Sequence, residues 1–187
     1  MNIPSPMPGV TYVKAPARSS ISDNAPVEAL VGEILADVRA RGDAAVRDYS
    51  ARFDKAELEV FEVTPEEREE ALALLEPQTR KDTEFAIENV RAFAKAQLST
   101  ILPLDVEILP GVHMGHRVIP IERVGCYVPG GRYPLLSAPI MTIVPAKVAG
   151  VDEVIACLPP NAHKAMIAGC HLSGADRIFR IGGAQAI

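Results

Sequence analysis

The chain has 187 residues, of which 48% are hydrophobic and 23% charged, and its formal net charge is −5. Its length suffices for one core, or for one core with a helical arm, and its composition is that of an ordinary folded protein. The net acidity and the lack of any Lys/Arg run longer than a dipeptide argue against a nucleic-acid partner.

Residues 1–104 are predicted to form a mostly helical region. Apolar residues recur every three or four positions from Val27 to Val38, which predicts a helix that Gly42 ends. Asp43 is a candidate cap for a second helix that runs to Phe53. Two helices are therefore expected before residue 54.

The stretch "TPEE" predicts the start of a third helix. Thr64 can cap it, Pro65 suits the first helical position, and Glu67 can reach back to the cap. This helix is expected to break near Pro77, and a longer helix is expected from about residue 78 to 97. The acidic residues of this stretch are interpreted as a solvated helix face.

Residues 105–187 are predicted to form a Rossmann-like α/β unit. The short runs "VEILP", "VHMGHRVIP" and "RVGCYVP" are typical of strands bounded by Pro or Gly. Helices and strands then alternate, which calls for a parallel sheet with cover on both faces. The expected elements are a helix at 137–148, a strand at 153–158, a helix at 161–172 and a strand at 177–182. The predicted fold class is thus α/β, with a helical arm and an apparently truncated sheet.

Two strand ends in this unit carry paired glycines. "CYVPGGRYPLLS" places Gly130 and Gly131 after one strand, with Ser137 as a candidate helix cap. "RIGGAQAI" repeats the arrangement, with Gln185 at the expected opening of another helix. Because ligands bind beyond the carboxyl ends of parallel strands, the two ends suggest one shared ligand. Neither is G-x-G-x-x-G, so simple turns remain an alternative.

Several residues that could bind a ligand or a metal could equally have a purely structural or solvent-exposed role. Tyr127 can pack at a strand end, and Arg132, which could pair with an anionic substrate, can simply be solvated. His113 and His116 stand three apart on a strand and so point to opposite faces, which disfavours a shared metal ion. No metal ligand is predicted in this chain.

The number and spacing of the cysteines and the hydropathy of the chain indicate the cellular compartment of the protein. The chain has three cysteines, widely spaced, which suits neither a disulfide framework nor a metal clip. No apolar run approaches the length of a bilayer span, and the first twenty residues are broken by prolines rather than forming the core of a signal peptide. We expect a cytoplasmic protein without a membrane partner.

The stretches "VGCYVPGGRYPLLSAPIMTIVPAKVAGVDEVIACLPP" and "GADRIFRIGGAQAI" resemble the histidinol dehydrogenase family, as does the helical "EILADVRARGDAAVRDYSARFD". The resemblance implies an NAD-dependent, zinc-containing homodimer that oxidises an alcohol. It also implies that Tyr127 and Gln185 contact NAD. From their place after the strand, Gly130 and Gly131 are assigned to cofactor binding and Arg132 to the substrate. The short loop "PGGRYPLLSAP" looks closer to the sulfopropanediol dehydrogenase branch.

The family is more than twice as long as this chain, and the resemblance implies that its zinc ligands and acid/base pair lie in the part not present. We therefore assign no catalytic residue here and interpret the chain as an N-terminal portion. The alternative is a non-catalytic fragment or pseudoenzyme that keeps a nucleotide crevice and an oligomerisation surface. On this interpretation the final strand should be under-buried, with Ile178, Phe179 and Ile181 exposed and Gln185 poorly fixed.

Overall fold

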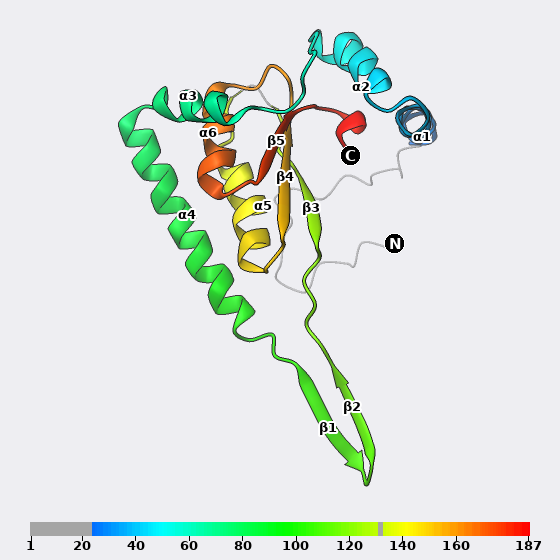
Figure 1. The fold of residues 1–187 in the computed structure, drawn as a ribbon, viewed down its shortest axis with the longest axis vertical. Helices are drawn as coiled ribbons and strands as arrows, with labels where there is room; N and C mark the ends of the chain where they lie inside the picture. The colour runs from blue at the N-terminus through cyan, green and yellow to red at the C-terminus, as the bar shows by residue number, and fades with distance from the viewer. Residues whose placement is uncertain (1–23, 131–132) are drawn as a thin grey trace, which may run out of the picture.

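The computed structural model describes residues 24–130 and 133–187 (Figure 1). A helical region leads into a long helix, a projecting hairpin and a small parallel sheet, so the α/β class is confirmed. None of the helices in these described ranges is long and apolar enough to cross a bilayer.

The first two helices follow the apolar pattern of the sequence. Helix α1 spans Ala25–Arg41, and Gly42 ends it with a φ of 56°, a left-handed value that glycine adopts without a Cβ penalty. Helix α2 spans Asp43–Tyr49, and its N-cap is Gly42. The prediction that Asp43 caps this helix is therefore wrong, because Asp43 is already its first residue. The chain continues as a π-helix, η1, at Ser50–Asp54.

Helix α3, Pro65–Ala73, begins with the predicted capping box. The Thr64 side chain accepts a hydrogen bond from the Glu67 backbone N–H at 3.2 Å, and the Glu67 carboxylate accepts one from the Thr64 N–H at 2.9 Å. Two helix-end donors are satisfied reciprocally.

Replacing Thr64 by Ala should lower the free energy of unfolding by about 1 kcal/mol, because one of these two hydrogen bonds is lost. Urea titration measures the change. Thr64→Ser keeps the hydroxyl and should retain most of the stability; equal losses in both variants would contradict the capping role.

The break expected near Pro77 is confirmed, because α3 ends at Ala73 and Pro77 is the first residue of helix α4, Pro77–Leu98, which packs along α5. The Glu76 carboxylate caps it by accepting from the Thr79 N–H at 2.8 Å. The chain then enters an antiparallel hairpin of β1, Leu104–Leu109, and β2, Val112–His116. The predicted strands are confirmed, but they form a separate two-stranded sheet that projects from the body (Figure 1). The parallel sheet begins later, at Arg123.

The parallel sheet has the order β3-β4-β5. Its strands and crossover helices are β3 Arg123–Tyr127, α5 Ser137–Val148, β4 Glu153–Leu158, α6 Lys164–Ser173 and β5 Arg177–Arg180. Helices α5 and α6 lie on one face of the sheet (Figure 1), and along β4 fully buried residues alternate with half-buried ones. The expected helical cover on both faces is therefore not found in the described residues. Ser137 does not cap α5 either, because Leu136 occupies the N-cap and no side chain bonds there.

The last strand is covered, contrary to the expectation of an under-buried edge. Ile178 is fully buried, and Phe179 and Ile181 are half-buried. The segment before α3 runs along the outer edge of β5: the Val63 N–H donates to the Ile178 carbonyl at 2.8 Å, and the Arg180 N–H donates to the Phe61 carbonyl at 2.8 Å. The expectation was wrong because it overlooked a segment distant in sequence that pairs with this edge.

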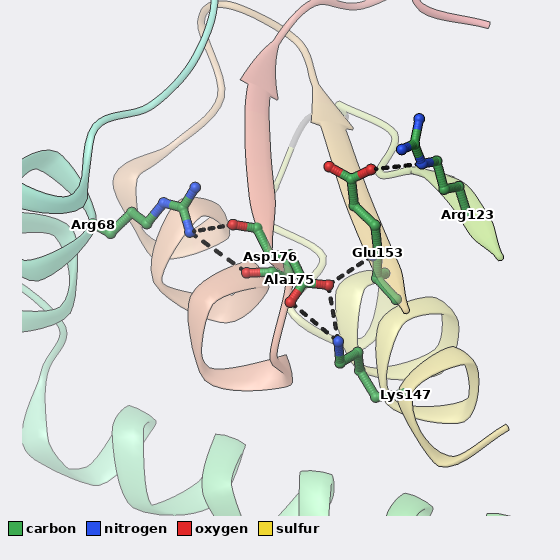
Figure 2. A network of polar contacts seen from close by, with 7 residues as sticks. Arg68, Arg123, Lys147, Glu153, Ala175 and Asp176 are labelled. Carbon is green, nitrogen blue, oxygen red and sulfur yellow. Dashed lines mark hydrogen bonds and ion pairs between the residues drawn. The ribbon is translucent and has the colours of Figure 1, made fainter. Parts of the chain in front are cut away.

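A network of hydrogen bonds and ion pairs connects the helices and strands at the amino end of the parallel sheet (Figure 2). The Asp176 carboxylate accepts from the Lys147 ammonium at 2.9 Å and from the Val154 backbone N–H at 2.7 Å. The Arg68 guanidinium donates to the backbone carbonyls of Ala175 and Asp176. Asp176 thereby joins α5, β4 and the start of β5.

Asp176 should make stability pH-dependent in acid. Partial burial opposes its charge, but the bonds from Lys147 and the Val154 N–H outweigh burial and lower the pKa of Asp176. Since the folded state then binds fewer protons than the unfolded state, this stabilisation is complete above the unfolded pKa of about 3.9 and is lost as pH falls through the lower folded value.

Asp176→Asn should cost about 1 kcal/mol at neutral pH, a figure discounted because the side chain is 39% exposed. The difference from the unmodified chain should shrink as pH falls from 4 toward 2, measured by urea titration at each pH. Asp152→Asn, an exposed change, serves as the control. A pH-independent difference would contradict this role of Asp176.

Candidate functional site

The carboxyl ends of β3 and β5 are joined by a hydrogen bond through Tyr127. This residue ends β3, and its hydroxyl accepts from the backbone N–H of Gly183, just after β5, at 3.3 Å. The side chain remains 38% exposed, so the ring is both anchored and accessible. The two glycine-bearing strand ends of the sequence therefore meet at one edge of the sheet, as predicted.

Gln185 lies beside this link in a short 3-10 helix, η2, at Ala184–Ala186. It is only 6% exposed, and its Nε2 donates to Asp54 Oδ2 at 3.4 Å. The expectation of a poorly fixed Gln185 is thus wrong, because Asp54 holds its amide. Its Oε1 is buried and has no hydrogen-bond partner among the described residues. Such an orphaned acceptor fits an N–H or O–H donor from a ligand or an ordered water.

Two of the glycines are required by their surroundings. Gly183 has a φ of 64°, and a Cβ there would lie 2.5 Å from Gln185 Oε1. A Cβ on Gly130 would lie 2.6 Å from the ring of Pro159, so the loops after β3 and β4 approach as closely as they do only because Gly130 has no side chain. Gly131 and Arg132 lie outside the described residues, and their assignments stay predictions.

A cavity of about 670 Å³ opens beyond the ends of β3 and β4. Its walls come from the loops after these two strands, from the start of α6 and from η1. They comprise Phe53, Asp54, Val128, Pro129, Gly130, Tyr133, Pro134, Leu135, Leu158, Pro159, Asn161, Ala162, His163 and Met166. A mostly apolar cavity with a few polar groups, at the carboxyl edge of a parallel sheet, is the usual place for a small-molecule ligand in an α/β protein.

Three polar residues of this cavity were missed by sequence reasoning. Asp54 ends η1, and the Asn161 side-chain amide donates to its backbone carbonyl at 2.7 Å. His163 caps α6, its Nδ1 accepting from the Ala165 N–H at 3.1 Å. Burial raises the pKa of Asp54. No local signal marks Asp54, because its place at the cavity depends on contacts with residues more than a hundred positions later.

The histidines and cysteines give no metal centre or nucleophile in the described ranges. His113 Nδ1 lies 3.0 Å from Asp105 Oδ1, His116 Nε2 lies 2.9 Å from the Leu102 carbonyl, and no cluster of three His, Cys, Asp or Glu residues there could hold a metal. Burial raises the pKa of the Cys126, Cys157 and Cys170 thiols, that of Cys170 to about 12. Thiols with raised pKa values are poor nucleophiles at neutral pH.

Comparison with known proteins identifies the family to which this chain belongs. The family model described as histidinol dehydrogenase matches residues 17–187. The chain belongs to the histidinol dehydrogenase family. The resemblance that rested on the strand-end motifs is confirmed over nearly the whole chain.

Relatives with two different names match at comparable identity. The sulfopropanediol 3-dehydrogenase of Ruegeria pomeroyi is 41% identical over 182 residues, which is 95% of this chain and 42% of that protein. The histidinol dehydrogenase of Methanosarcina mazei is 45% identical over 161 residues, 84% of this chain and 37% of that protein. The chain thus spans about two fifths of the length of these relatives.

A solved structure supports the fold directly. The crystal structure of histidinol dehydrogenase from Elizabethkingia anophelis superposes with a TM-score of 0.79 at 30% identity. The match covers 86% of this chain and 37% of that structure. The helical region and the parallel sheet are therefore part of a larger fold in this family member.

Proposed function

We propose that this chain provides the dinucleotide-binding part of an NAD-dependent dehydrogenase that oxidises an alcohol. The observation that carries the proposal is the cavity at the carboxyl edge of the parallel sheet, beside the Tyr127–Gly183 hydrogen bond. Membership of the histidinol dehydrogenase family supports the oxidation of an alcohol as the reaction class. Helices α5 and α6 begin beside this cavity, and helix N-termini favour the phosphates of a dinucleotide.

The residues at this edge fit a dinucleotide. Tyr127 offers an accessible ring, and Gln185 offers a buried acceptor without a partner in the described residues. Gly130 keeps the loop after β3 close to Pro159, which shapes the cavity wall. NAD, when bound, accepts the hydride from the substrate carbon. Gly131 and Arg132 remain proposed contacts, Arg132 with an anionic group of the substrate.

Zinc, which the family resemblance implies, does not fit the described residues. They contain no group of three or more ligating side chains that could hold a metal ion. We therefore assign no zinc ligand and no catalytic acid or base to this chain. Tight zinc binding is proposed only for the protein at the full length of its relatives.

We further propose a cytoplasmic homodimer. The β1–β2 hairpin supports self-association, because Val106 and Met114 pair across one face and are 41% and 61% exposed. Light scattering of the natural protein should report a dimer; a monomer at micromolar concentration would contradict this part of the proposal.

The test of function uses the natural protein at full length. Its binding of NAD is measured by calorimetry, and its activity is then screened. The screen uses zinc, NAD and a panel that includes histidinol and dihydroxypropane-sulfonate, and it follows NADH absorbance. NAD binding together with turnover of one alcohol supports the proposal. Binding without turnover of any alcohol favours a non-catalytic nucleotide-binding protein, and no NAD binding contradicts the assignment of the cavity.

A further inference from the structure

Asp54 is the acidic side chain among the described residues of the carboxyl-edge cavity. We propose that it makes this site select NAD over NADP by accepting a hydroxyl of the adenosine ribose and repelling a 2′-phosphate. This inference rests on the proposed function, and it adds the residue that discriminates between the two dinucleotides. In dinucleotide folds an acidic side chain does this work by its hydrogen-bonding capacity and its charge.

The position of Asp54 is fixed from two sides. Its backbone carbonyl accepts from Asn161 Nδ2 at 2.7 Å, which ties the end of η1 to the loop after β4. Its Oδ2 accepts from Gln185 Nε2 at 3.4 Å, while Oδ1 has no hydrogen bond to the described residues. One carboxylate oxygen is thus engaged by the protein, and the other is left for a ligand hydroxyl.

Among the described residues, the charges around Asp54 favour a neutral ribose over a phosphorylated one. The described residues that line the cavity include no Lys or Arg. The nearest cations in sequence are directed elsewhere: the Arg52 guanidinium lies 5.0 Å from the Phe53 ring centroid, and Lys55 Nζ donates to the Arg52 carbonyl at 2.9 Å. The pKa of Asp54 is raised by burial, in keeping with a carboxylate that has no close cation. A 2′-phosphate here would face a carboxylate at close range.

The experiment compares the dissociation constants of NAD and NADP for the natural protein, Asp54→Asn and Asp54→Ser by calorimetry. Asp54→Asn keeps the shape of the side chain and removes its charge. Asp152→Asn makes the same chemical change at an exposed residue before β4, at the opposite end of the sheet. The measured quantity is the NADP/NAD ratio of dissociation constants within each variant, which partial unfolding does not change.

The unmodified protein should favour NAD at least tenfold. Both Asp54 variants should reduce this preference about tenfold, and Asp152→Asn should leave it unchanged. If the unmodified protein binds NAD and the ratio in both Asp54 variants stays within twofold of its value, the role of Asp54 is overturned while the proposed function stands. If the unmodified protein binds neither dinucleotide, both are overturned.

Discussion

Ile178→Ala should lower the free energy of unfolding by about 2–5 kcal/mol. Ile178 is fully buried on β5 and belongs to the main hydrophobic core with Val63, Ala156 and Cys170. Removing its side chain beyond Cβ forfeits the burial of those atoms and leaves a cavity that the neighbouring strand cannot fully close. Urea titration gives the change as a lower midpoint at constant slope.

The matched control is Ile119→Ala, the same chemical change at a residue that is 73% exposed. It should alter the free energy of unfolding by less than about 0.5 kcal/mol. Similar losses in the two variants would show that β5 is not part of the core and that its predicted exposure was correct after all.

Tyr127→Ala should weaken NAD binding by at least about tenfold, or about 1.4 kcal/mol. The substitution removes both the exposed ring and the hydroxyl that accepts from the Gly183 N–H, so the ends of β3 and β5 lose their side-chain link. Because Tyr127 is assigned to cofactor contact, turnover at saturating NAD should change much less. Calorimetry and steady-state kinetics of the natural protein at full length measure the two effects separately.

Tyr127→Phe separates the ring from the hydroxyl. It should weaken binding by no more than about fivefold, since a single neutral hydrogen bond contributes roughly 1 kcal/mol and the ring remains. An NAD affinity within twofold in Tyr127→Ala, together with a large fall in turnover, would instead place Tyr127 in the chemical step.

The parts of the fold that sequence predicts well are those with local causes. The Thr64 capping box and the helix stop at Gly42 lie within a few residues of the structure they determine. The alternation of apolar strands and helices after Ser137 likewise predicts that neighbouring strands run parallel, because each helix carries the chain back to the start of the next strand. The sequence does not predict that β1 and β2 form a separate hairpin, because the pattern of a single strand does not show which other strand pairs with it.

The sequence predicts only those residues of the candidate site that lie at strand ends, and not Asp54. Tyr127 ends one strand and Gln185 follows another, and strand ends of a parallel sheet meet, so their proximity follows from topology. Asp54 comes from a π-helix in the helical region and reaches the cavity through contacts with Asn161 and Gln185. Contacts between such distant residues leave no periodic signal in the sequence. The same limitation explains the wrong prediction for Ile178.

The pairing of Phe61 and Val63 with β5 has a consequence for how the chain folds. The backbone bonds from Val63 to Ile178 and from Arg180 to Phe61 each join residues more than a hundred positions apart. Forming them closes a loop that contains α3, α4, the hairpin and most of the sheet, and the entropy of that closure is lost before the contacts stabilise the structure. The outer edge of β5 should therefore be among the last parts of the sheet to form. Once it forms, the helical region and the sheet should unfold in a single cooperative transition, because neither can detach without exposing the backbone of the other.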